Sequence, residues 1–143
     1  MKRCLADVNV CLALLVRHHE HHQTVRRWYD GIGSAELGLC RVVQLAAIRL
    51  LGNQTIMGKH AVPAGAAWDV IDELMLDERV EFVFEPPGLS EVMPTLLNYP
   101  IPTAKLITDA YLAAFAISSP CRLVTLDRAF RQFREVDLLM LGR

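Results

Sequence analysis

The chain lacks both an excess of charge of one sign and a long apolar run. Neither sign of charge is in excess, because 15 basic residues stand against 16 acidic ones and the net charge is −1. A nucleic-acid partner held by a globally basic surface is therefore excluded, and any such site must be a local patch. No apolar run reaches about 18 residues, the length that a membrane-spanning helix needs. We therefore expect no membrane partner.

The cysteines also lack a pattern, since none of the four forms a Cys-x-x-Cys pair. Three of them, Cys4, Cys40 and Cys121, lie in or beside apolar runs, and Cys11 is the fourth. This distribution favours buried, reduced thiols over disulfides and predicts a cytoplasmic protein. The start of the chain is not typical of a signal peptide either, because Asp7 arrives before an apolar h-region could form.

What is present indicates one folded domain. The chain has 143 residues, of which 52% are hydrophobic, so it can bury a sizeable core and is not expected to be disordered. Repeats, low-complexity segments and linker-like stretches are not found in the sequence. We therefore predict a single domain over residues 1–143.

Strand-like and helix-like segments alternate along the chain. The predicted strands cover residues 3–7, 36–40, 80–84, 121–126 and 136–141. The predicted helices cover residues 8–18, 24–29, 41–51, 63–76, 90–98, a long segment from 103 onward, and 128–133; residues 54–62 and the stretch around Pro100 and Pro102 are predicted loops. Such alternation predicts an α/β fold with a parallel sheet between helical layers.

Three aspartates stand out against these apolar segments. Asp7 closes the first predicted strand, Asp127 follows the strand at 121–126, and Asp109 lies inside the long apolar helix. Ligands of open parallel sheets bind at the carboxyl ends of the strands, where Asp7 and Asp127 would lie. A buried carboxylate such as Asp109 needs a partner, a metal or an opening to water. Converging carboxylates repel one another unless a cation neutralises them, and oxygen ligands favour Mg²⁺ or Mn²⁺ over zinc.

Each of these features also has a purely structural explanation. Asp7 and Asp127 precede predicted helices and could be N-caps, and Asp109 could be an early-helix acid that favours the helix dipole. The histidine-rich segment could bind zinc through His18 and His22, which are four residues apart. A solvated helix end is the simpler explanation of those histidines.

The basic residues nearest to the predicted site follow the last aspartate. Arg128 is adjacent to Asp127, and Arg131 lies about one helical turn further on. Most arginines of a protein are surface charge. These two are nevertheless the best placed to bind an RNA phosphate backbone.

The three aspartate segments together resemble those of the PIN-domain ribonucleases. They read Asp7-Val-Asn9, Thr108-Asp109-Ala-Tyr-Leu-Ala-Ala114 and Leu123-Val-Thr-Leu-Asp127-Arg-Ala-Phe130. Within that family the chain is similar to the VapC-type toxins of bacterial toxin–antitoxin pairs. Further likeness is found at His22-Gln-Thr-Val-Arg-Arg-Trp28, Arg41-Val-Val-Gln44 and Ile48-Arg-Leu-Leu51, so the resemblance covers nearly the whole chain.

This resemblance implies a fold, an activity and partners. The fold is a single-domain three-layer α/β/α sandwich with a central parallel sheet. The activity is Mg²⁺- or Mn²⁺-dependent cleavage of RNA by a metal-activated water, with Asp7, Asp109 and Asp127 as the catalytic metal ligands. The implied partners are a small cognate antitoxin and a second copy of the chain in a homodimer. Asn9 is similar to the polar residue that supports the first aspartate, and Thr125 to the hydroxyl residue before the last.

Gln44 departs from the family pattern. Many members place a glutamate early in the helix after the second strand, and an amide can coordinate through its carbonyl oxygen but adds no charge. The alternative function is therefore a PIN-like binding module with weak or no cleavage. A phosphoacceptor domain, which also gathers aspartates at strand ends, is disfavoured because a lysine near the final strand is missing.

Overall fold

A parallel sheet forms the centre of the protein, whose computed structural model describes residues 2–98 and 104–142. In this part of the chain the strands are β1 (Arg3–Ala6), β2 (Leu37–Leu39), β3 (Val80–Phe82), β4 (Cys121–Thr125) and β5 (Leu138–Met140). Their order is β3-β2-β1-β4-β5, and every neighbouring pair is parallel. The predicted α/β fold with a central parallel sheet is thus confirmed. The predicted loop around Pro100 and Pro102 lies outside the described residues.

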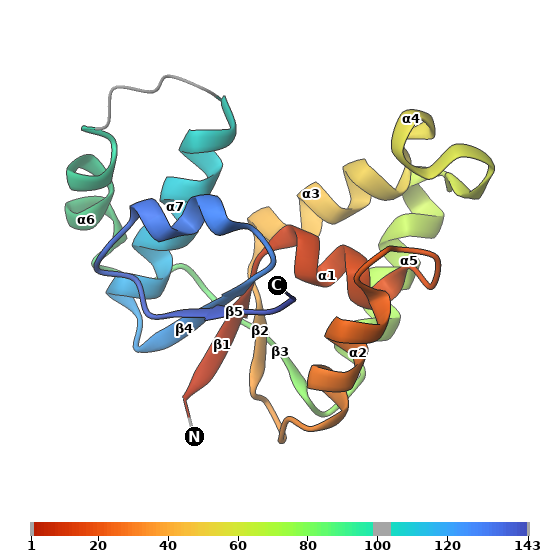
Figure 1. Ribbon diagram of the computed structural model, residues 1–143, viewed down its shortest axis with the longest axis horizontal. Helices are drawn as coiled ribbons and strands as arrows, with labels where there is room; N and C mark the ends of the chain where they lie inside the picture. The colour runs from red at the N-terminus through yellow and green to blue at the C-terminus, as the bar shows by residue number, and fades with distance from the viewer. Residues whose placement is uncertain (1, 99–103, 143) are drawn as a thin grey trace.

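Helices cover both faces of this sheet. They are α1 (Val8–Leu15), α2 (His22–Asp30), α3 (Arg41–Leu51), α4 (Gln54–Met57), α5 (Ala64–Met75), α6 (Leu89–Leu96) and α7 (Ala104–Ser118), with 3-10 helices η1 (Gly58–His60) and η2 (Arg128–Gln132). Figure 1 shows α6 and α7 on one side of the sheet and α1, α2, α3 and α5 on the other. The arrangement is the expected three-layer sandwich. None of the helices in the described ranges is long and apolar enough to cross a bilayer.

The neighbouring strands β1 and β4 are mostly apolar because helices pack on each side of the sheet. Leu5 in β1 and Leu123 in β4 are at most 1% exposed. A strand covered on both faces reads as a continuous apolar run, which is why both strands were predictable from the sequence. In α7, Ala113, Ala114 and Phe115 are completely buried. The small alanines allow the helix to approach the sheet closely while the aromatic ring fills the core.

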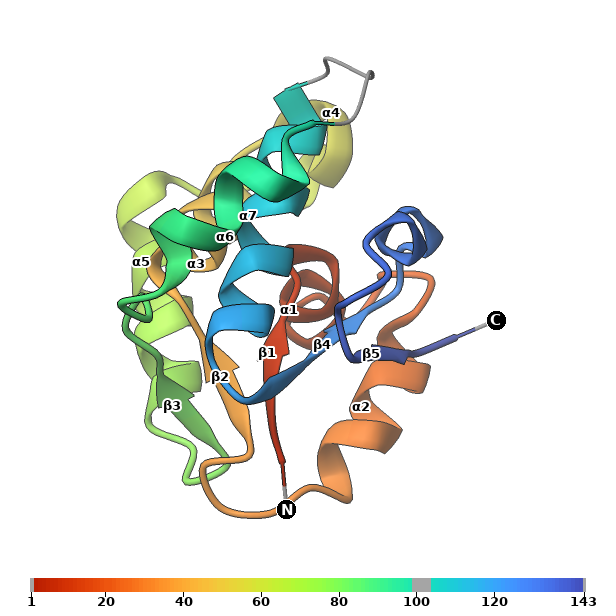
Figure 2. The ribbon, with the colours of Figure 1, turned by 90° about the vertical axis from the view of Figure 1, so that its left-hand side faces the viewer.

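The strand order reverses between β1 and β4. From β1 the chain adds β2 and then β3 on one side, and it then crosses to the other side of β1 to form β4 and β5. Figure 2 shows β1 and β4 side by side at the middle of the sheet. Crevices for ligands form at such a reversal, outside the carboxyl ends of the two strands. Asp7 follows β1 at this point and Asp127 lies two residues after β4.

The prediction of a loop over residues 54–62 is wrong, because this segment contains α4 and η1. Asn53 starts α4, since its side-chain oxygen accepts a hydrogen bond of 3.1 Å from the Ile56 amide. Gly58 ends the helix with a φ of 55°, which glycine adopts at little cost. A four-residue helix is too short to show helical periodicity, so only the cap residue could have indicated it.

Replacing Asn53 by alanine should lower the free energy of unfolding by about 1 kcal/mol, because the Ile56 amide loses its acceptor. Urea denaturation followed by circular dichroism measures the change. Thr55→Ala is the matched control in the same short helix and should shift the value by less than about 0.5 kcal/mol. Equal stabilities of Asn53→Ala and wild type would show that the cap does not hold α4.

Candidate functional site

Asp7 is the most buried carboxylate of the crevice, with 3% of its surface exposed. Its backbone amide donates to the Val124 carbonyl at 3.0 Å, which ties the end of β1 to β4. One carboxylate oxygen accepts the Val8 amide at 2.7 Å and caps α1. The other accepts the hydroxyl of Thr125 at 2.8 Å. Asp7 is therefore a helix cap, as the structural explanation predicted, and its second oxygen faces β4.

Thr125 connects two of the predicted site residues. Its buried hydroxyl donates to Asp7 and accepts the backbone amide of Asp127 at 2.9 Å. The Asp127 carboxylate in turn accepts the Ala129 amide at 2.9 Å and caps η2. One side chain thus fixes both the direction of the Asp7 carboxylate and the turn that carries Asp127.

Asp109 enters the site from the second turn of α7 and is 7% exposed. Lys105, one turn earlier, places its ammonium 3.0 Å from Asp109 and 2.5 Å from Asp127. The lysine is the partner that a buried carboxylate requires. Sequence reasoning missed Lys105, although the four-residue spacing from Asp109 on a predicted helix is a signal for such an ion pair.

The carboxylates differ in how strongly their surroundings oppose ionisation. Burial raises the pKa of Asp7 to about 6, helped by the charges of Asp109 and Asp127 and opposed by the hydrogen bonds from Thr125 and Val8. Burial also raises the pKa of Asp109, against the attraction of Lys105. For Asp127 burial acts in the same direction, but the hydrogen bonds from Lys105 and Ala129 outweigh it and its pKa falls below the usual value. Lys105 therefore leaves part of the negative charge without compensation.

The donor set fits a divalent cation with a preference for oxygen ligands, because three carboxylates converge and carry uncompensated charge. Within residues 2–98 and 104–142, no three Asp, Glu, His or Cys side chains are positioned to hold a metal ion. The position between Asp109 and Asp127 is taken by the ammonium of Lys105. A metal ion would therefore have to replace Lys105 as the counter-charge of this pair.

Gln44 is buried at the start of α3, with 4% of its surface exposed. Its carbonyl oxygen, the atom expected to face a metal, accepts a hydrogen bond of 2.7 Å from Arg41. The Arg41 guanidinium in turn lies 4.9 Å from the ring centroid of Phe82 and 5.6 Å from that of Trp68. In the structure, Gln44 therefore interacts with a residue of its own helix. The sequence-based prediction had placed it beside the metal.

A cavity of about 470 Å³ opens beside Asp127. Its lining consists of Asn9, His19, Glu20, His21, Leu126, Asp127 and Arg128. Two predicted residues, Asn9 and Arg128, therefore lie with Asp127 around one cavity. Arg131 is exposed on η2, outside this lining.

The histidine-rich segment does not form the pair that its spacing suggested. The ring of His18 stacks on His60 with centroids 4.4 Å apart, and His22 is bound through Nδ1 to the Ala13 carbonyl at 2.7 Å. His19 and His21, whose spacing was not considered, are the two that reach the cavity. A sequence pattern cannot show this, because the segment is a turn and not a regular helix.

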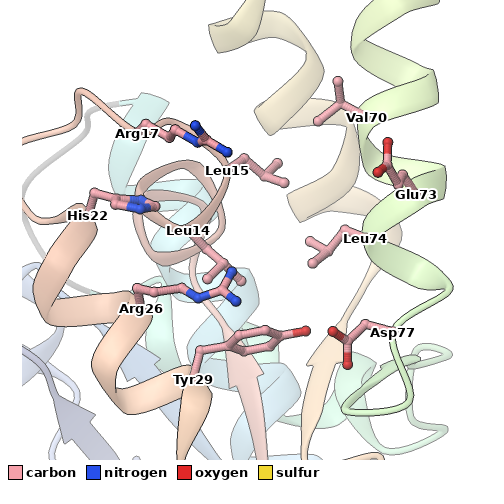
Figure 3. A pocket seen from close by; sticks show the side chains of 10 residues that line it. All are labelled: Leu14, Leu15, Arg17, His22, Arg26, Tyr29, Val70, Glu73, Leu74 and Asp77. Carbon is pink, nitrogen blue, oxygen red and sulfur yellow. The ribbon is translucent and has the colours of Figure 1, made fainter.

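A larger cavity of about 590 Å³ lies among α1, α2 and α5 (Figure 3). Asp7, Asp109 and Asp127 do not line this cavity. Its lining consists of Leu14, Leu15, Arg17, His22, Arg26, Tyr29, Val70, Glu73, Leu74 and Asp77. Figure 3 shows the Tyr29 hydroxyl directed toward Asp77. Burial, together with this carboxylate, raises the pKa of Tyr29 to about 12. The volume of a cavity therefore does not identify the site of the three aspartates, because the larger cavity contains none of them.

Comparison with known proteins agrees with this architecture. The PIN domain family matches residues 4–136, and the chain belongs to that family. It is 35% identical to the ribonuclease VapC41 of Mycobacterium tuberculosis, over 97% of this chain and 99% of that protein. It is 29% identical to VapC37 of the same organism, over 92% of each chain.

Solved structures show the same fold at low sequence identity. The DNA-bound VapBC of Salmonella typhimurium superposes with a TM-score of 0.70 at 14% identity, over 98% of each chain. VapC20 of Mycobacterium tuberculosis, a toxin that cleaves the sarcin–ricin loop, gives a TM-score of 0.64 at 17% identity, over 90% of this chain and 93% of that chain. At these identities the likeness concerns the fold.

Asp7→Asn should stabilise the protein at neutral pH and not in acid. Because the folded-state pKa of about 6 exceeds the ordinary value of 3.8, ionised Asp7 destabilises the fold increasingly as pH rises between these values. In chelator at pH 7.5 the amide should raise the free energy of unfolding by about 3 kcal/mol, and at pH 4 the gain should vanish. Urea denaturation at both pH values measures the difference.

Asp137→Asn is the control for this experiment, because the pKa of Asp137 is shifted in the opposite direction to that of Asp7. The hydrogen bond from Lys2, together with the charges of Lys2 and Arg122, holds the pKa of Asp137 below its usual value. Its amide variant should therefore gain no stability at pH 7.5. A gain for Asp7→Asn of the same size at both pH values would contradict the assigned pKa.

Proposed function

We propose that this protein is a Mg²⁺- or Mn²⁺-dependent endoribonuclease that acts as the toxin of a toxin–antitoxin pair, with residues 1–143 forming one PIN domain. The observation that carries the proposal is the convergence of Asp7, Asp109 and Asp127 where the strand order reverses. Family membership and the ribonuclease relatives support the same activity. VapC20, which has the same fold, is a toxin that cleaves the sarcin–ricin loop.

In the proposed reaction Asp7, Asp109 and Asp127 would hold the metal ion through their carboxylate oxygens. When bound, the metal ion lowers the pKa of a water and stabilises charge on the phosphate. A carboxylate oxygen of the site accepts the proton of that water as its oxygen attacks phosphorus. The bond from phosphorus to the 3′ oxygen breaks, and the leaving oxygen takes a proton from solvent, which gives a 5′-phosphate and a 3′-hydroxyl. Thr125 keeps Asp7 oriented, and Arg128, in the cavity beside Asp127, is placed to bind the RNA.

Lys105 is the counter-ion of this site when no metal is bound. It bridges Asp109 and Asp127. Because its side chain is 61% exposed, the ammonium can move into solvent when a metal ion binds. Once displaced, its ammonium remains on the first turn of α7, beside the site of reaction. The chain therefore carries its own competitor for the metal position.

Removing that competitor should tighten metal binding. Lys105→Gln should lower the Kd for Mn²⁺, measured by isothermal calorimetry, by about tenfold, because two ion pairs of roughly 0.5–1 kcal/mol no longer have to be broken. Lys2→Gln is the matched control, since Lys2 pairs with Asp137 on a different part of the protein. Unchanged or weaker Mn²⁺ binding by Lys105→Gln, with normal binding by Lys2→Gln, would mean that the ammonium does not compete with the metal.

The partners of the proposed function are RNA, a small cognate antitoxin and a second copy of the chain. The structural relatives include VapBC and FitAB complexes bound to DNA. A homodimer is supported by exposed apolar side chains near α6 and α7. Phe84, before α6, is 81% exposed, Leu97, just after α6, is 42% exposed, and Ile107, on α7, is 58% exposed. The four cysteines are free and buried, which suits the reducing cytoplasm.

The experiment that tests the proposal compares wild type with Asp109→Asn. Wild type should cleave mixed RNA in Mn²⁺ and arrest growth when overexpressed, and a co-expressed antitoxin should restore growth. Asp109→Asn should stay folded and lose about a hundredfold or more of the cleavage rate. Asp69→Asn changes the same charge at an exposed position of α5 and should cleave normally. Folded wild-type protein that binds Mn²⁺ but cleaves no RNA would favour a binding module instead.

A further inference from the structure

The cavity beside Asp127 has the size and the lining of a ligand subsite. Its volume of about 470 Å³ lies within the range of small-molecule pockets, roughly 300–1,000 Å³. It combines two imidazoles, His19 and His21, with the guanidinium of Arg128 and the carboxylate of Glu20. Aromatic faces, donors and an acceptor are therefore gathered next to a proposed metal ligand.

Each imidazole has a neighbour within this segment, because His19 bonds to the His21 backbone and His21 Nε2 lies 3.6 Å from Glu20 Oε1. His19 accepts the backbone amide of His21 through Nδ1 at 3.1 Å, so the neutral ring carries its proton on Nε2 and can donate from there. Burial lowers the pKa of His19, and the nearby His21 adds to the effect, which favours this neutral form. The two ring centroids are 5.8 Å apart, at an interplanar angle of 45°.

Residues after β5 close the wall behind His21. Gly142 has a φ of 66°, and a Cβ at this position would come within 3.6 Å of His21 Nδ1 and 3.3 Å of the Leu126 side chain. A side chain at residue 142 would therefore contact the His21 ring and the Leu126 side chain, and glycine leaves this space to them.

We propose that this cavity binds an unpaired base of the RNA substrate, guanine by preference, beside the phosphate that is cleaved; the proposal rests on the proposed ribonuclease function. Single-stranded RNA is recognised by bases that stack on aromatic side chains and arginine planes and form hydrogen bonds along their edges. Guanine offers two acceptors, N7 and O6, that suit Arg128. It also offers the N1 and N2 donors, which suit the carboxylate of Glu20.

Neither a metal ion nor a free phosphate fits this lining as well. No three metal-binding side chains are grouped for a cation in the part of the chain that the structure describes. A phosphate would face the carboxylates of Glu20 and Asp127, with Arg128 as the formal positive charge of the lining. A neutral base avoids this repulsion and can use both the donors and the acceptor.

Nucleotide binding tests the subsite without any cleavage. Guanosine 5′-monophosphate, titrated in chelator, should shift the NMR signals of the His19 and His21 rings. Cytidine 5′-monophosphate and ribose 5-phosphate should bind about tenfold more weakly. Glu20→Gln, an isosteric change at an exposed position, should remove the preference for guanine. His18→Ala is the control, because His18 stacks on His60 outside the cavity lining, and should leave binding unchanged.

The outcomes separate the subsite from the ribonuclease function. If the ring signals do not move, or if ribose 5-phosphate binds as well as the guanine nucleotide, the base subsite is wrong even when wild type cleaves RNA. If the guanine nucleotide binds as expected and Glu20→Gln loses the preference, the subsite stands. Cleavage of a randomised RNA by wild type should then show a guanine preference at one position beside the cut, and the products of Glu20→Gln should show none. Failure of wild type to cut any RNA contradicts the proposed function alone.

Discussion

The repulsion among three converging carboxylates is the constraint on which the site depends. Each carboxylate meets it in a different way: Asp7 through the Thr125 hydroxyl and a helix cap, Asp109 through Lys105, and Asp127 through Lys105 and a second cap. These contacts reduce the cost of burying charge but do not remove it, because the pKa of Asp7 and of Asp109 stays raised. A site of this kind gains stability when it binds a cation.

The sheet topology explains why these particular residues meet. The reversal of strand order puts the ends of β1 and β4 next to each other, and the Asp7 amide bonded to Val124 holds them in register. The sequence indicated this convergence because both strands are apolar runs that stop at or just before an aspartate. Asp109 could be assigned for a related reason, since a carboxylate within an apolar helix must face something other than the core.

Other parts of the site depend on contacts that a single sequence does not reveal. Lys105 lies on the same helix as Asp109, yet its contact with Asp127 joins segments 22 residues apart. Gln44 matches a family position, but the hydrogen bond from Arg41 depends on how that guanidinium packs on Phe82. His19 reaches the cavity beside Asp127 because the turn before α2 folds back toward β4 and η2, and turns carry no periodicity that predicts direction.

In the proposed function, Asp7, Asp109 and Asp127 bind a divalent metal ion in the place that Lys105 now holds. Anomalous X-ray scattering from crystals of the protein grown with Mn²⁺ is the decisive test. We expect an anomalous peak coordinated by oxygen atoms of the three aspartates, with the Lys105 ammonium withdrawn from Asp109 and Asp127. A manganese ion bound elsewhere, or a Lys105 that still bridges the two carboxylates at saturating Mn²⁺, would contradict it.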